Sequence, residues 1–134
     1  MELTLRPTSE SLPALRRCAA RSLRTVPEEV IADVLLALDE AVSNAIRHGS
    51  AGGGLVEVSL RVDGGWIDMR VRDRGPTRQL PTLPNGPPPT LASGGRGLWL
   101  IAQLVDEVVL ERRGRGTQLR LRRRAESRAL LHRG

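Results

Sequence analysis

The sequence contains no lysine, no phenylalanine and no tyrosine, and it has a single cysteine, Cys18. Without lysine there can be no P-loop lysine, no lysine of the eukaryotic protein-kinase type and no Schiff-base catalyst. Two tryptophans are the only aromatic residues, which argues against a nucleic-acid surface built on base stacking. One cysteine and two histidines exclude an intramolecular disulfide and argue against a zinc site.

Long apolar segments are also missing. No run approaches the ~18 residues that a membrane-spanning helix requires. The first residues lack the basic and then apolar pattern of a signal peptide. We therefore expect a reduced, cytoplasmic setting and no membrane partner.

The chain has 134 residues, 40% of them hydrophobic, which is typical of one globular domain with a core of leucine, valine, isoleucine and alanine. Its net charge is +6, and all 21 basic residues are arginines. The arginine clusters at 112–115 and 122–124 could follow a phosphate backbone. A solvated strand face and tail explains them better, so we expect no direct nucleic-acid binding.

Two helices are predicted in the first part of the chain. The first spans about 11–24 and can be capped by Ser9 or Ser11. The second begins at the capping-box pattern of residues 25–28, carries an apolar stripe at helical spacing and stops at Gly49.

Strands are predicted in the second part of the chain. Alternating apolar and polar residues over 56–62 and 67–72, with a turn at 63–65, indicate an antiparallel hairpin. Residues 76–93 hold six of the nine prolines and are expected to form a mobile loop. After this loop we predict a helix over 98–104 and two strands, near 107–112 and 117–122.

Three polar residues share one face of the second helix. Glu40, Asn44 and His48 are spaced four residues apart, on the side away from the apolar stripe. They form either a solvated face or one wall of a binding site. The neighbouring row at positions 39, 43 and 47 is explained by solvent exposure.

Asp73 is in phase with the buried side of its strand. A carboxylate there needs hydrogen-bond donors, which could be an arginine, a backbone N–H or the amino group of a ligand such as adenine. A simple turn residue before Arg74 and Gly75 is an equally open interpretation. Thr117 is also in phase with a buried face, where it could bond a base or a water, or simply fill the start of a strand.

Glycine is concentrated at 94, 95 and 97, before the third helix. Glycines let a backbone approach a ligand closely, and a helix start presents free N–H groups to an anion. This would hold phosphates without lysine. Arg96 could add charge to a phosphate or face solvent.

In chain order, these features resemble the histidine-kinase-like (GHKL) ATPase superfamily, and within it the small anti-sigma-factor serine/threonine kinases. The resemblance covers about residues 1–123 and is most specific over 38–49 and 94–101. It implies the Bergerat fold: a two-layer α/β sandwich with a mixed, mostly antiparallel sheet covered on one face by three helices. It also implies an ATP-binding domain over 1–123 with a lid at 76–94, followed by a basic tail, 124–134.

The resemblance assigns roles to individual residues. Asn44 would coordinate the Mg²⁺ that bridges the phosphates, and Glu40 would be the general base. Asp73 would accept a hydrogen bond from the adenine amino group, with Gly75 allowing close approach. One departure is Thr77, where the family often has a second glycine. The other expected nucleotide-binding residues are Arg47, His48, Gly95, Arg96, Gly97, Leu98 and Thr117.

By the same resemblance, the expected function is that of an anti-sigma-factor serine/threonine kinase that uses ATP and Mg²⁺. Such a protein binds a sigma factor and phosphorylates an antagonist protein, and the family likeness suggests a homodimer. A nucleotide-dependent interaction module without kinase activity is the alternative. The catalytic domain of a sensor kinase fits less well, because the N-terminal part leaves no room for a dimerising helical pair.

Overall fold

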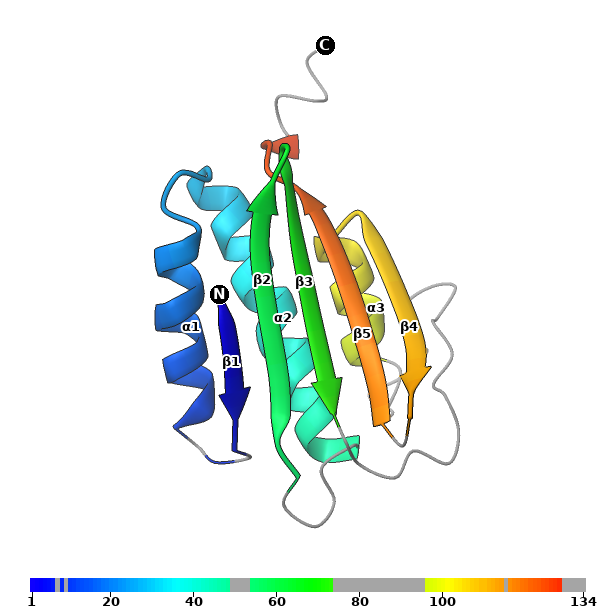
Figure 1. Cartoon of the computed structure of the whole chain (residues 1–134). Coiled ribbons are helices and arrows are strands. Elements are labelled where there is room, and N and C mark those ends of the chain that lie inside the picture. Colours follow the sequence, from blue (N-terminus) through cyan, green and yellow to red (C-terminus); the bar gives the residue numbers. More distant parts are fainter. Residues whose placement is uncertain (7, 9, 49–53, 74–95, 115, 129–134) are drawn as a thin grey trace.

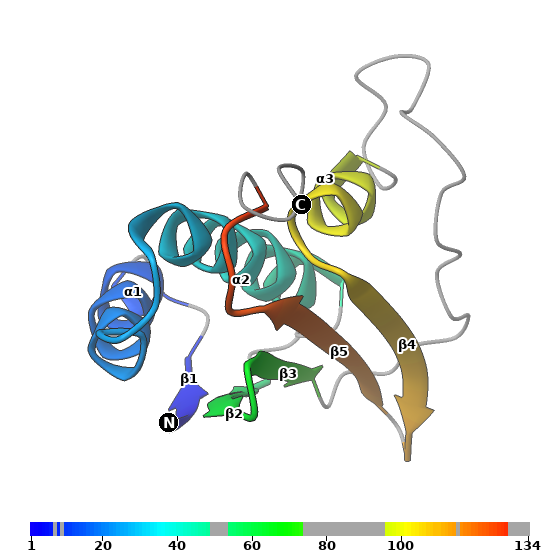
Figure 2. The ribbon, with the colours of Figure 1, turned by 90° about the horizontal axis from the view of Figure 1, so that it is seen from above.

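The structure of the chain is a computed structural model that describes residues 1–6, 8, 10–48, 54–73, 96–114 and 116–128. It is a five-stranded sheet with three helices on one face (Figure 1; Figure 2). The strands are β1 (Glu2–Leu5), β2 (Val56–Asp63), β3 (Trp66–Asp73), β4 (Glu107–Arg113) and β5 (Gly116–Arg124). The helices are α1 (Ser11–Ser22), α2 (Glu28–His48) and α3 (Arg96–Leu104).

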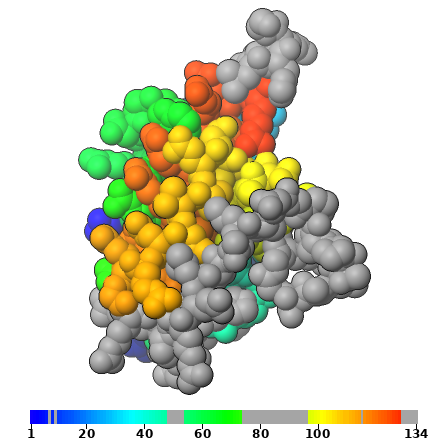
Figure 3. All heavy atoms as spheres, turned by 90° about the vertical axis from the view of Figure 1, so that its right-hand side faces the viewer, coloured from blue at the N-terminus to red at the C-terminus, as the bar shows by residue number. Residues whose placement is uncertain are grey.

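The strand order is β1-β2-β3-β5-β4, and each of the four pairings is antiparallel. The expected fold class is confirmed. The predicted sheet was mixed, however, and no parallel pair occurs among the described strands. β3 and β4 are joined through α3 and run in the same direction, yet β5 lies between them. The single-helix crossover therefore produces no parallel pair. β4 forms the edge of the sheet on the side of α3 (Figure 3).

The predicted hairpin is confirmed as β2 and β3. Its turn consists of Gly64 and Gly65, with φ angles of +57° and +81°. This two-residue turn requires positive φ at both central positions. Residues with a side chain rarely adopt positive φ, so glycine suits both positions. β2 extends one residue beyond the predicted alternation, to Asp63, and β3 extends one residue at each end, to Trp66 and Asp73.

The core lies between the helices and the covered face of the sheet. The apolar stripe of α2 is buried against alternate residues of β2, β3 and β5, as the two periodicities predicted. Among the described residues, no helix is long and apolar enough to span a membrane.

The start of α1 differs from the prediction. Glu10 is the residue before the helix and makes no side-chain capping bond. Ser11 is the first helical residue, and its hydroxyl donates to the backbone carbonyl of Arg6. The prediction that Ser11 caps the helix is therefore wrong, because this oxygen is used to tie the β1–α1 connection. Ser9 lies outside the described residues.

The end of the sheet opposite the Asp73 end of β3 holds a buried arginine. Arg123 is 1% exposed, and its Nη2 donates to Asp33 of α2 at 3.0 Å. Its Nη1 donates to the backbone carbonyls of Arg124 and Glu126 and lies 3.8 Å from a carboxylate oxygen of Asp106. The interpretation of 122–124 as a solvated cluster is therefore wrong for Arg123, which faces the helices.

Candidate nucleotide-binding site

One end of the molecule gathers residues that are far apart in the sequence. The C-terminal ends of α2 and β3 lie there with the N-terminal ends of α3 and β5 (Figure 1). These elements carry Asn44, Asp73, Gly97 and Thr117 respectively. The structure thus brings together four of the residues that the sequence singled out.

Asn44 packs directly against the first turn of α3. A Cβ built on Gly97 would lie 2.8 Å from Nδ2 of Asn44 and 3.0 Å from its Oδ1. Real Cβ contacts are longer than this, so Gly97 leaves a space that the amide fills. Asn44 is half-buried, and its amide is held between two helices near the start of α3.

Arg47 contacts the same amide. Its Nη2 donates to Oδ1 of Asn44 at 2.5 Å, while the rest of the side chain is exposed. The prediction that this row of α2 faces solvent is therefore confirmed for Arg47. The resemblance also assigned Arg47 to the nucleotide, and the contact that the structure gives it is this hydrogen bond with Asn44.

Asp73 and Thr117 meet where β3 ends and β5 begins. They are 7% and 8% exposed, which confirms the buried phase predicted for both. The backbone N–H of Thr117 donates to Oδ1 of Asp73 at 3.4 Å. A backbone N–H was one of the donors that the sequence left open for this carboxylate. The carboxylate is thus held at a strand end rather than in a solvated turn.

Glu40 is half-buried on α2, one helical turn before Asn44. Leu98 is 7% exposed and belongs to the hydrophobic core. Gly75, Gly95 and Thr77, the predicted lid at 76–94 and the tail after 128 lie outside the described residues. The side chains of His48 and Arg96 also lie outside the description.

Sequence reasoning missed an ion pair between α1 and α2. Nε of Arg16 on α1 donates to Oδ2 of Asp39 at 2.8 Å, and this bond raises the pKa of Arg16. The row containing Asp39 had been interpreted as solvated. No local spacing signals this pair, because the partners lie on different helices.

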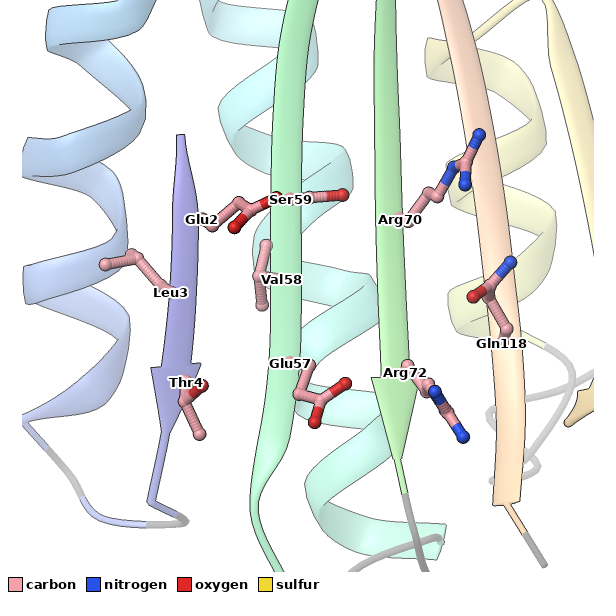
Figure 4. Close-up of a pocket in the computed structure, with 9 residues that line it drawn as sticks. All are labelled: Glu2, Leu3, Thr4, Glu57, Val58, Ser59, Arg70, Arg72 and Gln118. Atoms are coloured by element: carbon pink, nitrogen blue, oxygen red, sulfur yellow. The ribbon is translucent and has the colours of Figure 1, made fainter. Parts of the chain in front are cut away.

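The uncovered face of the sheet carries a shallow groove across β1, β2, β3 and β5 (Figure 4). Its polar lining includes acidic Glu2 and Glu57 and basic Arg70 and Arg72. Along the same face, Arg120 and Asp68 form an ion pair at 2.9 Å. The groove faces away from the helices, so it is separate from the site built around Asn44.

The chain is similar to known proteins over most of its length. The sequence model described as the histidine kinase-like ATPase domain matches residues 5–123. Curated relatives include the serine-protein kinase RsbW of Listeria innocua serovar 6a and that of Listeria monocytogenes serotype 4b. Each is 28% identical over 120 residues, covering 82% of this chain and 76% of the relative.

Solved structures show the same fold. The RsbU and RsbW domains of a Mycobacterium tuberculosis protein match with a TM-score of 0.69 and 24% identity over 92% of this chain, which spans only 31% of that chain. A blue-light activated histidine kinase domain of Erythrobacter litoralis matches with a TM-score of 0.58 and 22% identity, covering 85% of this chain and 61% of that one. The family match extends over most of the sequence and agrees with this fold, and so the chain belongs to the histidine kinase-like ATPase domain family.

Proposed function

We propose that this chain is an ATP-dependent serine/threonine protein kinase that acts as an anti-sigma factor. It would bind a sigma factor and phosphorylate a serine or threonine of an antagonist protein. The names of the Listeria relatives support the kinase activity, whereas the sigma factor, the antagonist and a homodimer rest on family resemblance. The observation that carries the proposal is the Asn44–Gly97 contact beside Glu40.

Asp73 is suited to hold the adenine ring. Its carboxylate is buried at the end of β3 and already accepts one backbone hydrogen bond. A buried carboxylate is an acceptor with further lone pairs, which the exocyclic amino group of adenine can satisfy. Guanine presents a carbonyl oxygen at that position, so this carboxylate favours adenine over guanine nucleotides.

The residues present also fit a magnesium–phosphate group. The Asn44 amide lies where a glycine leaves room for it at the start of α3, and an amide oxygen is a ligand that Mg²⁺ accepts together with phosphates and waters. When bound, Mg²⁺ would neutralise charge on the phosphates. The backbone of α3 would add N–H groups and the positive end of the helix dipole.

Glu40 is proposed as the general base. It would remove the proton from the hydroxyl of the target serine or threonine while that oxygen attacks the γ-phosphorus and ADP leaves. Its position one turn before Asn44 places it on the same flank of α2 as the proposed phosphate end of the site. The lid at 76–94 and the domain boundary at 123 remain part of this proposal.

Nucleotide binding is tested by thermal denaturation with ATP, ADP or GTP, with and without Mg²⁺. A ligand that binds only the folded chain raises the melting temperature. We expect the adenine nucleotides to raise it and GTP to have much less effect. If no adenine nucleotide stabilises the chain, the proposed function is wrong.

Kinase activity is tested by transfer of labelled phosphate from ATP to a candidate antagonist protein. Replacing Glu40 by alanine should lower transfer at least about 100-fold, the usual size of a general-base contribution, while ATP still stabilises the chain. Glu29→Ala, on an exposed position of the same helix, is the matched control. ATP binding without transfer by the natural sequence would favour a nucleotide-dependent interaction module.

A further inference from the structure

The amide of Asn44 is fixed from two sides. Gly97 lies close to both of its polar atoms, and Nη2 of Arg47 donates to Oδ1 at 2.5 Å. A guanidinium has five donors and no acceptor, so it pairs with the oxygen and never with the nitrogen of an amide. Arg47 therefore decides which atom of the amide is engaged.

The same oxygen is the metal ligand in the proposed function, on which this inference rests. A guanidinium and a divalent cation cannot share one amide oxygen closely, because like charges at such short separation repel strongly. The guanidinium thus occupies the oxygen that the cation would bind. Arg47 has to withdraw before Asn44 can serve as a ligand.

Arg47 is well placed for such a movement. Its side chain is exposed, so its displacement breaks no packing in the core. It lies in the last turn of α2 and contacts Asn44, which packs against the start of α3, where phosphates are proposed to bind. A phosphate is a stronger partner for a guanidinium than a neutral amide is, so a bound nucleotide would draw Arg47 away from Asn44.

We propose that the guanidinium of Arg47 occupies the metal-binding oxygen of Asn44 and releases it only when a nucleotide polyphosphate is bound. Binding is then ordered, with the nucleotide before the divalent cation. The guanidinium also weakens the affinity of the complex for Mg²⁺, because part of the population keeps Arg47 on Asn44. Arg47 acts on the metal through Asn44 and is a positioning residue.

The test separates the Mg²⁺ dependence of nucleotide binding from the affinity for the nucleotide itself. A fluorescent ADP analogue is bound first in chelator, and MgCl₂ is then titrated into the complex. The variants are Arg47→Met, which removes the charge and the donor, and Arg47→Lys, which keeps the charge. Arg17→Met, at an exposed position of α1, is the control for the loss of one positive charge.

We expect Arg47→Met to lower the Mg²⁺ concentration at half-saturation about three- to tenfold, as the loss of one competing hydrogen bond at an exposed position predicts. The Mg²⁺ midpoint of Arg47→Lys should lie between those of Arg47→Met and the natural sequence. The midpoint of Arg17→Met should equal that of the natural sequence. An unchanged or higher Mg²⁺ midpoint in Arg47→Met would overturn the proposal, even if the metal-free affinity for ADP fell. Failure of the natural sequence to bind the analogue would instead overturn the proposed function, and this inference with it.

Discussion

At the scale of single residues, the uncovered face of the sheet holds charges in pairs. Asp68 of β3 accepts hydrogen bonds from Nη2 and Nε of Arg120 at 2.9 and 3.3 Å. These bonds lower the pKa of Asp68, and partial burial opposes them only in part. The carboxylate therefore stays charged in the folded chain at a pH where it would be protonated in the unfolded chain.

This pair predicts a pH dependence of stability. The pKa of Asp68 is lower in the folded chain than in the unfolded chain. Its contribution to the free energy of unfolding is therefore fully present above the ordinary carboxyl pKa of about 3.9, and it is lost as the pH falls through the folded pKa. Asp68→Asn should thus be less stable than the natural sequence at pH 7, and the difference should shrink below pH 4. Melting temperatures measured from pH 3 to 7 check this. A difference that grows on acidification would contradict the pairing.

The carboxylate of Asp73 makes a second prediction at this scale. Asp73→Asn replaces acceptor lone pairs by an amide that presents donors to the adenine amino group. Sites that lose a matched buried hydrogen bond discriminate by large factors, so we expect at least a tenfold weaker affinity for ATP, measured by calorimetry. Asp63→Asn, at an exposed strand end, should bind as the natural sequence does. Equal affinities of both variants would remove Asp73 from the site.

At the scale of elements, the site depends on how closely α2 and α3 approach each other. The contact between Asn44 and Gly97 is made at the first turn of α3, where a side chain of any size would meet the amide. Helix packing distances are set by the side chains at the contact. A glycine here lets α3 bring its N-terminal backbone to the polar flank of α2.

Gly97→Ala separates this packing effect from helix propensity. At an exposed helix position without close neighbours, alanine stabilises the helix relative to glycine by about 1 kcal/mol. Here the added Cβ would meet Asn44 at 2.8 Å, so we expect a net loss of about 1–3 kcal/mol, typical of overpacking, and weaker stabilisation by Mg-ATP. Urea denaturation with and without nucleotide measures both effects. Gln103→Ala, exposed on the same helix, is the control, and a more stable Gly97→Ala chain would show that Asn44 moves aside at little cost.

At the scale of the whole molecule, Arg123 joins four parts of the chain. It links β5 to α2 through Asp33, to the α3–β4 connection through Asp106, and to the segment after β5 through the backbone carbonyl of Glu126. Arg128 adds a hydrogen bond from this segment to the carbonyl of Gln103 at the end of α3. These directional contacts fix the far ends of helices whose near ends carry the candidate site.

Replacing Arg123 by methionine should destabilise the chain. Breaking a buried ion pair costs about 3–5 kcal/mol, but the side chains of Asp33 and Asp106 keep 31% and 27% exposure. Water can therefore replace part of the lost interaction. We expect the free energy of unfolding, measured by urea denaturation, to fall by about 1–3 kcal/mol. Arg61→Met, at an exposed position of β2, should change stability by less than about 0.5 kcal/mol. If both variants unfold alike, the buried cluster contributes little.

Local pattern was sufficient for most of the helices and strands, whereas the fold class was predicted by resemblance. The period of two in β2 and β3 determined that Asp73 points inward, and the spacing of Glu40 and Asn44 determined that they share a helix flank. These features follow from backbone geometry, which repeats every two or 3.6 residues whatever the rest of the chain does. The same alternation would have placed Arg123 on the covered face, had its charge not suggested solvent.

Other features depend on contacts between residues that are distant in the sequence, and only the tertiary structure decided them. The capping prediction for Ser11 failed because its hydroxyl serves the β1–α1 connection. The sequence placed Asn44 and Gly97 in one site by resemblance, but the close approach of their atoms depends on the packing of two helices. Partners of charged groups depend in the same way on the assembled sheet and helices, because a charge carries no periodicity that reveals which opposite charge it will meet.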